Sequence, residues 1–134
     1  FVINLPPSTL VKELDLCGMK SGRDLDKIAA CGLTTVPGNQ VKAPVLKEAP
    51  LALECKVKQE IPLGSHEMFL AEIVSVDADE ALFNTEGRLC MEKAGLLAYA
   101  HGAYYTLGKR VGLFGFSTKK KKKHNWNWKK YSLK

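Results

Sequence analysis

A chain of 134 residues with 46% hydrophobic residues is long enough to bury the core of one folded domain. It holds no run of about 18 apolar residues and no secretion-signal pattern, so we expect a cytoplasmic protein without a membrane span. The formal charge of +6 arises at one end, because residues 119–134 contain eight Lys and no acid, while residues 1–118 carry −2.

The basic end predicts a disordered, Lys-rich tail at 119–134, following a single domain at 1–118. A nucleic-acid-binding domain normally spreads its basic residues over a folded face, so nucleic acid is not the expected partner. Trp126 and Trp128 lie between lysines and leave open a weak, salt-dependent association with nucleic acid. A shift of reading frame in the Lys run is a further explanation for the basic tail, which would then have no selected role.

The domain begins with the strand-like run FVINL, which Pro6 and Pro7 end. Ser8 is the expected N-cap of a helix with apolar residues at helical spacing, closed by Gly18. Ser21 and Asp24 have the spacing of a capping box, which predicts a second short helix up to Gly32. Residues 34–50 contain three prolines and are expected to form a surface excursion.

Two long strands are expected next. Residues 51–61 alternate, which predicts a half-buried strand with Leu51, Leu53, Cys55 and Val57 on one face and Ala52, Glu54, Lys56 and Lys58 on the other. After a turn at 62–65, residues 68–76 are apolar on both faces, which predicts a central strand. Asn84–Gly87 is a further expected turn.

Strand pairs joined by short turns, with two small helices inserted, predict a mainly β (α+β) antiparallel barrel. The four cysteines, Cys17, Cys31, Cys55 and Cys90, form no Cys-x-x-Cys pair. This spacing argues against a metal site or a disulfide scaffold, and we expect reduced, mostly buried thiols.

Several separate sequence motifs occur together in one known family. These motifs are FVINL, CGxxSGRDxDK at 17–27, GLT at 32–34, LECKV, LGSHEMFLAEIVSV and AYAHGAYYTLGKRVGLFGFS. Together they resemble the flavin reductase-like, FMN-binding split-barrel family, and its flavoredoxin-like members in particular. The resemblance covers roughly residues 1–118. Full members have more strands before FVINLP, so we expect this chain to be truncated at the N-terminus and to hold the C-terminal two-thirds of the domain.

The resemblance implies a homodimer that binds FMN without a covalent link and transfers electrons from NAD(P)H or a redox partner. Lys27 matches a flavin-contacting position, where a cation stabilises negative charge on the reduced ring. Ser21 and Arg23 belong to the same SGRDxDK motif. They are expected to hold the phosphate of FMN at the start of the predicted second helix. A solvated Lys27, and pairing of Arg23 with Asp24 or Asp26, remain the alternatives.

His66 follows a Gly-Ser turn at the start of an apolar strand. In the family pattern it lies beside the flavin, where it is the expected catalytic residue and a hydrogen-bonding partner of the ring or of the electron donor. Tyr99 is a candidate wall for the isoalloxazine ring, with His101 at the same rim. A purely structural role stays open for His66 in its turn and for Tyr99 in the core.

The sequence thus predicts an FMN-dependent, flavin reductase-like oxidoreductase with no metal. A non-enzymatic FMN-binding electron carrier is the alternative, and neither the electron donor nor the acceptor follows from the sequence.

Overall fold

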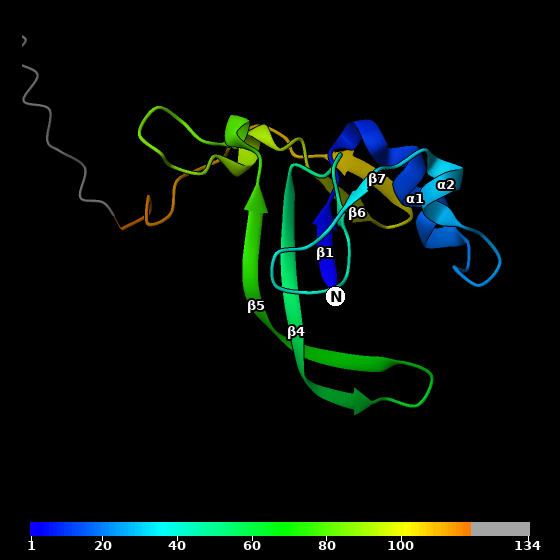
Figure 1. The fold of residues 1–134 in the computed structure, drawn as a ribbon. Helices are drawn as coiled ribbons and strands as arrows, with labels where there is room; N and C mark the ends of the chain where they lie inside the picture. The colour runs from blue at the N-terminus through cyan, green and yellow to red at the C-terminus, as the bar shows by residue number, and fades with distance from the viewer. Residues whose placement is uncertain (119–134) are drawn as a thin grey trace, which may run out of the picture.

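The computed structural model describes residues 1–118 of the chain, and in these residues the fold is built from antiparallel strands with a few short helices (Figure 1). The strands are β1 (Val2–Leu5), β2 (Thr35–Val36), β3 (Val45–Leu46), β4 (Leu51–Pro62), β5 (Glu67–Ala78), β6 (Leu97–Ala100) and β7 (Ala103–Thr106). The helices are η1 (Ser8–Leu10), α1 (Val11–Met19), α2 (Lys27–Cys31), η2 (Glu80–Leu82) and η3 (Met91–Lys93). The predicted tail at 119–134 lies outside the described residues, so its structure and its association with nucleic acid stay predictions.

The largest sheet has the strand order β1-β4-β5, and all its pairings are antiparallel. The prediction that the apolar segment after His66 is a central strand was wrong, because β4 is central and β5 is an edge strand of the described sheet. Phe69 is 48% exposed and Ile73 is 55% exposed. Apolar character on both faces is a property of strands that are covered on both sides, and in the described residues β5 has no such cover.

The two halves of β4 differ in burial. Leu51, Ala52, Glu54 and Cys55 are buried, whereas residues 56–60 are exposed on both faces (Figure 1). The predicted alternation was therefore wrong for this strand. Ala52 and Glu54 alternate with Leu51 and lie on the second face, yet both are buried, and the loop between β2 and β3 binds the carboxylate of Glu54.

Glu54 is the side chain that holds this loop. Its carboxylate accepts hydrogen bonds from the backbone N–H groups of Asn39 (2.7 Å), Gln40 (2.7 Å) and Val41 (2.8 Å). A Cβ at Gly38 would lie 2.7 Å from the carbonyl oxygen of Val41, so only glycine fits this close approach. Residues 34–50 thus form the expected surface excursion, with the short strands β2 and β3 inside it.

The first helix begins differently from the prediction. Ser8 makes no side-chain cap, and a 3-10 turn leads into α1, which continues past Gly18 to Met19. The second helix was predicted from Ser21, but α2 begins at Lys27 and the carboxylate of Asp26 caps it by accepting the N–H of Ala29 (3.1 Å). Gly32 ends α2 with φ 63°, as the sequence predicts.

The last hairpin, β6–β7, packs near the start of the chain (Figure 1). The N–H of Ser8 donates to the carbonyl of Gly95 (2.7 Å), and the hydroxyl of Tyr104 donates to Asp15 on α1 (3.0 Å). His101 (φ 49°) and Gly102 (φ 83°) form the two-residue turn, and two positive φ values match the right-handed twist of a hairpin. The predicted turn at Asn84–Gly87 is confirmed by the Gly87 N–H bond to the Asn84 carbonyl (3.0 Å).

All four cysteines are free, as expected. Only Cys55 and Cys90 are buried, while Cys17 and Cys31 are half-buried, so the prediction of mostly buried thiols holds for two of the four. In the part of the chain that the structure describes, no helix has both the length and the apolar character needed to cross a bilayer.

Candidate functional site

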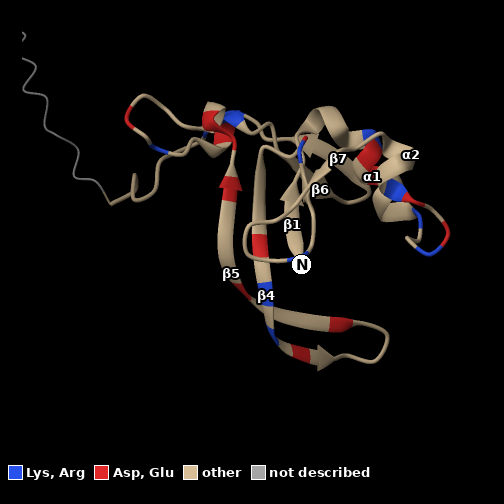
Figure 2. Ribbon diagram, in the orientation of Figure 1, with Lys and Arg blue, Asp and Glu red and all other residues tan. Residues whose placement is uncertain are grey.

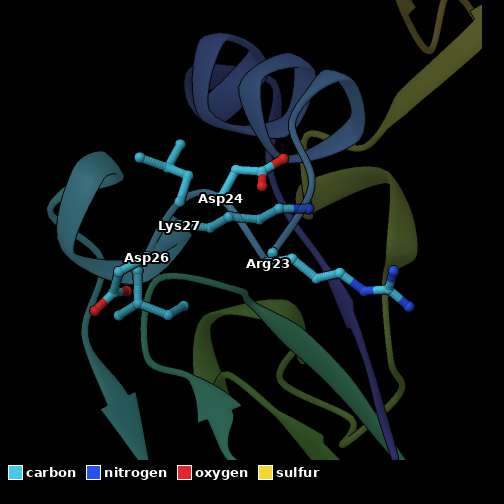
Figure 3. A pocket seen from close by; sticks show the side chains of 7 residues that line it. Arg23, Asp24, Asp26 and Lys27 are labelled. Carbon is cyan, nitrogen blue, oxygen red and sulfur yellow. The ribbon is translucent and has the colours of Figure 1, made fainter.

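The segment between α1 and α2 surrounds an open pocket of about 630 Å³ (Figure 3). Its lining comes from residues 22–28, which include two basic and two acidic side chains and the apolar Leu25 and Ile28. Arg23, Asp24 and Asp26 are exposed, and Lys27 is half-buried. Two of the three site residues predicted from the SGRDxDK motif, Arg23 and Lys27, therefore line the same pocket, whereas Ser21 lies just before it in the chain.

Lys27 has a fixed position in this pocket. Its Nζ donates to the backbone carbonyl of Cys17 at the end of α1 (2.5 Å), and Figure 3 shows its side chain extended across the pocket. An ammonium carries three N–H donors, so this contact uses one of them. The alternative of a freely solvated lysine is therefore not what the structure has.

Ser21 and Arg23 form a turn rather than a helix start. The hydroxyl of Ser21 accepts the N–H of Arg23 (3.1 Å), and its carbonyl accepts the N–H of Asp24 (3.2 Å). The prediction that these residues open a helix was therefore wrong, since α2 begins at Lys27, has five residues and is capped by Asp26, while their contact with a phosphate stays a prediction. Arg23 extends away from Lys27 (Figure 3) and makes no ion pair with Asp24 or Asp26.

Tyr99 presents an aromatic surface on the β6–β7 hairpin. Its ring lies 5.1 Å from that of Tyr104 between centroids, at an angle of 59°, and the residue is 67% exposed. The alternative of a core tyrosine is thus excluded in the described residues. A hydrogen bond to Asp15, together with desolvation, raises the pKa of Tyr104, so its hydroxyl stays protonated and the ring pair stays anchored to α1.

His101 and His66 lie in different turns. His101 is exposed in the β6–β7 turn, while His66 is exposed in the β4–β5 turn, where its Nδ1 lies 2.8 Å from the hydroxyl of Ser65. Figure 1 shows α1, α2, β6 and β7 at one end of the molecule and the β4–β5 turn at the opposite end. One chain therefore does not bring His66 together with Lys27 or Tyr99.

The structure also reveals groups that the sequence gave no means of finding. The carbonyl of Cys17, which holds Lys27, and Asp15, which holds Tyr104, have no signature in the sequence. Acidic and basic residues are interspersed along the described chain: β1 carries none, β4 carries residues of both signs, and β5 carries only acidic ones (Figure 2). No group of three or more His, Cys, Asp or Glu in residues 1–118 is arranged to hold a metal ion.

Comparison with known proteins identifies the family. The model of the flavin reductase like domain matches residues 1–108, and the chain belongs to this family. Flavoredoxin of Desulfovibrio vulgaris (Miyazaki F) has 33% sequence identity and a TM-score of 0.80, with 89% of this chain and 64% of that chain covered. An uncharacterized protein of Archaeoglobus fulgidus is 36% identical over 81 residues, which are 60% of this chain and 46% of the relative.

The fold comparison agrees with the predicted architecture. A putative flavin reductase with a split barrel domain from Shewanella frigidimarina superimposes with a TM-score of 0.70 at 24% identity, covering 84% of this chain and 58% of that chain. The mainly β, antiparallel split-barrel prediction is thus confirmed. The chain spans about half the length of the curated relatives it matches.

The residue types present at this end of the molecule are suited to binding a flavin. Lys27 supplies a positioned cation for an anionic group, and the exposed ring of Tyr99 supplies a flat surface for stacking. Leu25 and Ile28 add apolar lining to the pocket beside Lys27. These features lie at the same end of the molecule, whereas His66 does not (Figure 1).

Proposed function

We propose that the protein binds FMN and acts as a flavin reductase-like oxidoreductase, with NAD(P)H or a redox protein as electron donor. The main supporting observation is the position of the Lys27 ammonium, which the Cys17 carbonyl holds in the pocket formed by the SGRDxDK motif. Membership of the flavin reductase like domain family supports the same function. Bound FMN would supply the two-electron chemistry.

In this proposal the chain's own residues bind and orient the cofactor. Lys27 would present its ammonium to the ring edge at which negative charge develops, and its bond to Cys17 restricts its motion. Tyr99 would stack on one face of the ring, Ser21 and Arg23 would contact the phosphate, and His101 would lie at the rim. His66 hydrogen-bonds the ring or the incoming donor.

A homodimer is part of the proposal, because it can bring His66 of one copy to the Lys27 end of another. Two observations support it. The β4–β5 turn lies far from the pocket within one chain (Figure 1), and apolar residues of β5 such as Phe69 and Ile73 are about half exposed. Large exposed apolar surfaces are typical of interfaces.

The test uses the full chain with excess FMN. After dialysis we expect a yellow protein with flavin absorption bands, and a measurable heat on titration with FMN. A colourless protein that gives no heat contradicts the proposal. Anaerobic addition of NADH or NADPH then bleaches the bands of a reductase.

A non-enzymatic electron carrier is the second candidate, and the similarity to flavoredoxin favours it. For a carrier, the bound flavin stays oxidised with NAD(P)H alone and is reduced only after a redox protein is added.

Lys27→Ala tests the cation. We expect the dissociation constant for FMN to rise about tenfold, because a charge-assisted contact is lost, and the reduction potential of the bound flavin to fall. The matched control is Lys12→Ala, which removes an exposed lysine from α1. Equal affinities and potentials in both variants would remove Lys27 from the site.

His66→Ala tests the proposed catalytic role. We expect stopped-flow reduction of the flavin to slow by at least about tenfold, with a smaller change in FMN affinity. Ser65→Ala is the control, since it removes only the hydroxyl beside the imidazole Nδ1. A loss of affinity with an unchanged reduction rate would make His66 a structural residue.

A further inference from the structure

Two cysteines that are separate in the sequence lie side by side in the structure. The Sγ atoms of Cys17, on α1, and Cys31, at the end of α2, are 3.9 Å apart. Both side chains are half-buried, whereas Cys55 and Cys90 are buried elsewhere. A disulfide has a sulfur separation of about 2.0 Å, so the two sulfurs must approach each other by about 2 Å for the bond to form.

We propose that Cys17 and Cys31 form a reversible disulfide, closed by a low-molecular-weight disulfide such as oxidised glutathione. One thiolate attacks the small disulfide, forms a mixed disulfide and releases one small thiol. The thiolate of the second cysteine then attacks the protein sulfur of this mixed disulfide, which forms the Cys17–Cys31 bond and releases the second small thiol. The protein loses two protons and two electrons, and the small disulfide gains them.

The surroundings of Cys31 lower the reactivity of its thiol. Desolvation raises the pKa of the Cys31 thiol, and the neighbouring Cys17 and the charge of Glu13 raise it further, against the opposing charge of Lys27. Because the thiolate is the reactive species, a raised pKa makes Cys31 less reactive. Closure of the bond removes two electrons from the pair and therefore requires an oxidant.

The bond would enclose the pocket segment. Residues 18–30 lie between the two cysteines and include Ser21, Arg23 and Lys27. Lys27 already donates to the carbonyl of Cys17, so the disulfide would fix both ends of the segment that positions its ammonium. The consequence for FMN affinity rests on the proposed function, but the formation of the bond does not.

Intact mass measurement on the full chain tests the bond without any flavin. After incubation with oxidised glutathione and alkylation in denaturant, we expect two alkyl labels, where the untreated protein takes up four because it has four cysteines. Reduction with dithiothreitol should restore four labels. Cys17→Ser and Cys31→Ser should each retain one glutathione, because the second step is blocked.

Brief digestion with an arginine-specific protease gives a second readout. Arg23 is exposed and lies between the two cysteines. In the oxidised protein we expect the pieces cut at Arg23 to migrate together until dithiothreitol is added, and in Cys31→Ser to separate without it. Four labels after oxidation, or a linkage to Cys55 or Cys90, would overturn the proposal.

The effect of the disulfide on FMN binding is measured in a separate experiment. If the segment positions FMN, the oxidised protein should bind it about threefold to tenfold tighter than the reduced protein, because less motion is lost on binding. A disulfide that forms without FMN binding in either state leaves the redox proposal intact and contradicts the proposed function.

Discussion

The two halves of β4 differ in their role, because one half is part of the buried core and the other belongs to an exposed hairpin. Between Leu51 and Cys55 the strand lies between β1 and β5 and under the 38–41 loop, and even the carboxylate of Glu54 is fully buried. Beyond Cys55 the paired strands β4 and β5 continue as an exposed hairpin toward His66 (Figure 1). The comparison teaches that contacts from outside the strand, rather than its residue pattern, decide which half belongs to the core.

Glu54→Ala should strongly destabilise the buried half. Removal of the carboxylate leaves three backbone N–H groups of the 39–41 loop without their acceptor, and we expect the Tm to fall by roughly 10 °C. Glu60→Ala, at an exposed position of the same strand, is the matched control and should change the Tm by less than about 2 °C. Similar shifts for both variants would contradict the contrast between the halves.

Asp77→Asn should have an intermediate effect of opposite sign. Asp77 Oδ2 is buried without a hydrogen-bond partner. Desolvation and then the neighbouring Glu54 raise the pKa of Asp77, against a hydrogen bond from Asn39. Its charged form therefore destabilises the fold at neutral pH. An amide can instead donate to Glu54, so we expect the Tm at pH 7 to rise by about 3 °C.

The pH dependence of the Tm difference between Asp77→Asn and the wild type tests whether the charged form of Asp77 is destabilising. As the pH falls toward the ordinary Asp value of 3.8, wild-type Asp77 gains a proton in the fold, and the advantage of Asp77→Asn should shrink. Burial raises the pKa of Glu54, but the hydrogen bonds from Gln40, Asn39 and Val41 outweigh it and lower the pKa overall. Its stabilisation is therefore lost only below about pH 4.5. An advantage that grows in acid would contradict the assignment.

Ile73→Thr should have the smallest effect on stability. Ile73 pairs with Cys55 but is 55% exposed, while Cys55 is 3% exposed. Threonine keeps the β-branched shape, so we expect the Tm to fall by less than about 2 °C and any self-association seen by sedimentation to weaken. Leu51→Ala, at a residue 5% exposed, is the contrasting variant and should cost about 3 kcal/mol. A cost at Ile73 as large as that at Leu51 would show that β5 is covered.

The sequence predicted elements whose signals are local. Gly32 ends α2, and Asn84–Gly87 forms a turn, because these functions depend on a few neighbouring residues. The start of α2 was missed because Ser21, with Asp24 at capping-box spacing, and Asp26 are all residue types that cap helices, and the spacing cannot rank the two possible starts. The burial of Glu54 was missed because its partners lie 13 to 15 residues away in a loop.

The candidate site was predictable as a set of residues but not as a geometry. Of the residues predicted from the SGRDxDK motif, Arg23 and Lys27 line one pocket, and Ser21 directly precedes its lining segment. The separation of His66 from that pocket was not predictable, because it follows from the length and direction of the β4–β5 hairpin. The approach of Cys17 to Cys31 likewise depends on how α1 packs against α2.

The attachment of the β6–β7 hairpin to the start of the chain has a consequence for biosynthesis. Ser8 bonds to Gly95, and Tyr104 bonds to Asp15 across 89 positions. Because α1 precedes residues 95–104 in the chain, it leaves the ribosome before the residues that it finally packs against. The ring pair of Tyr99 and Tyr104 therefore assembles only when almost all of the described chain is available to fold.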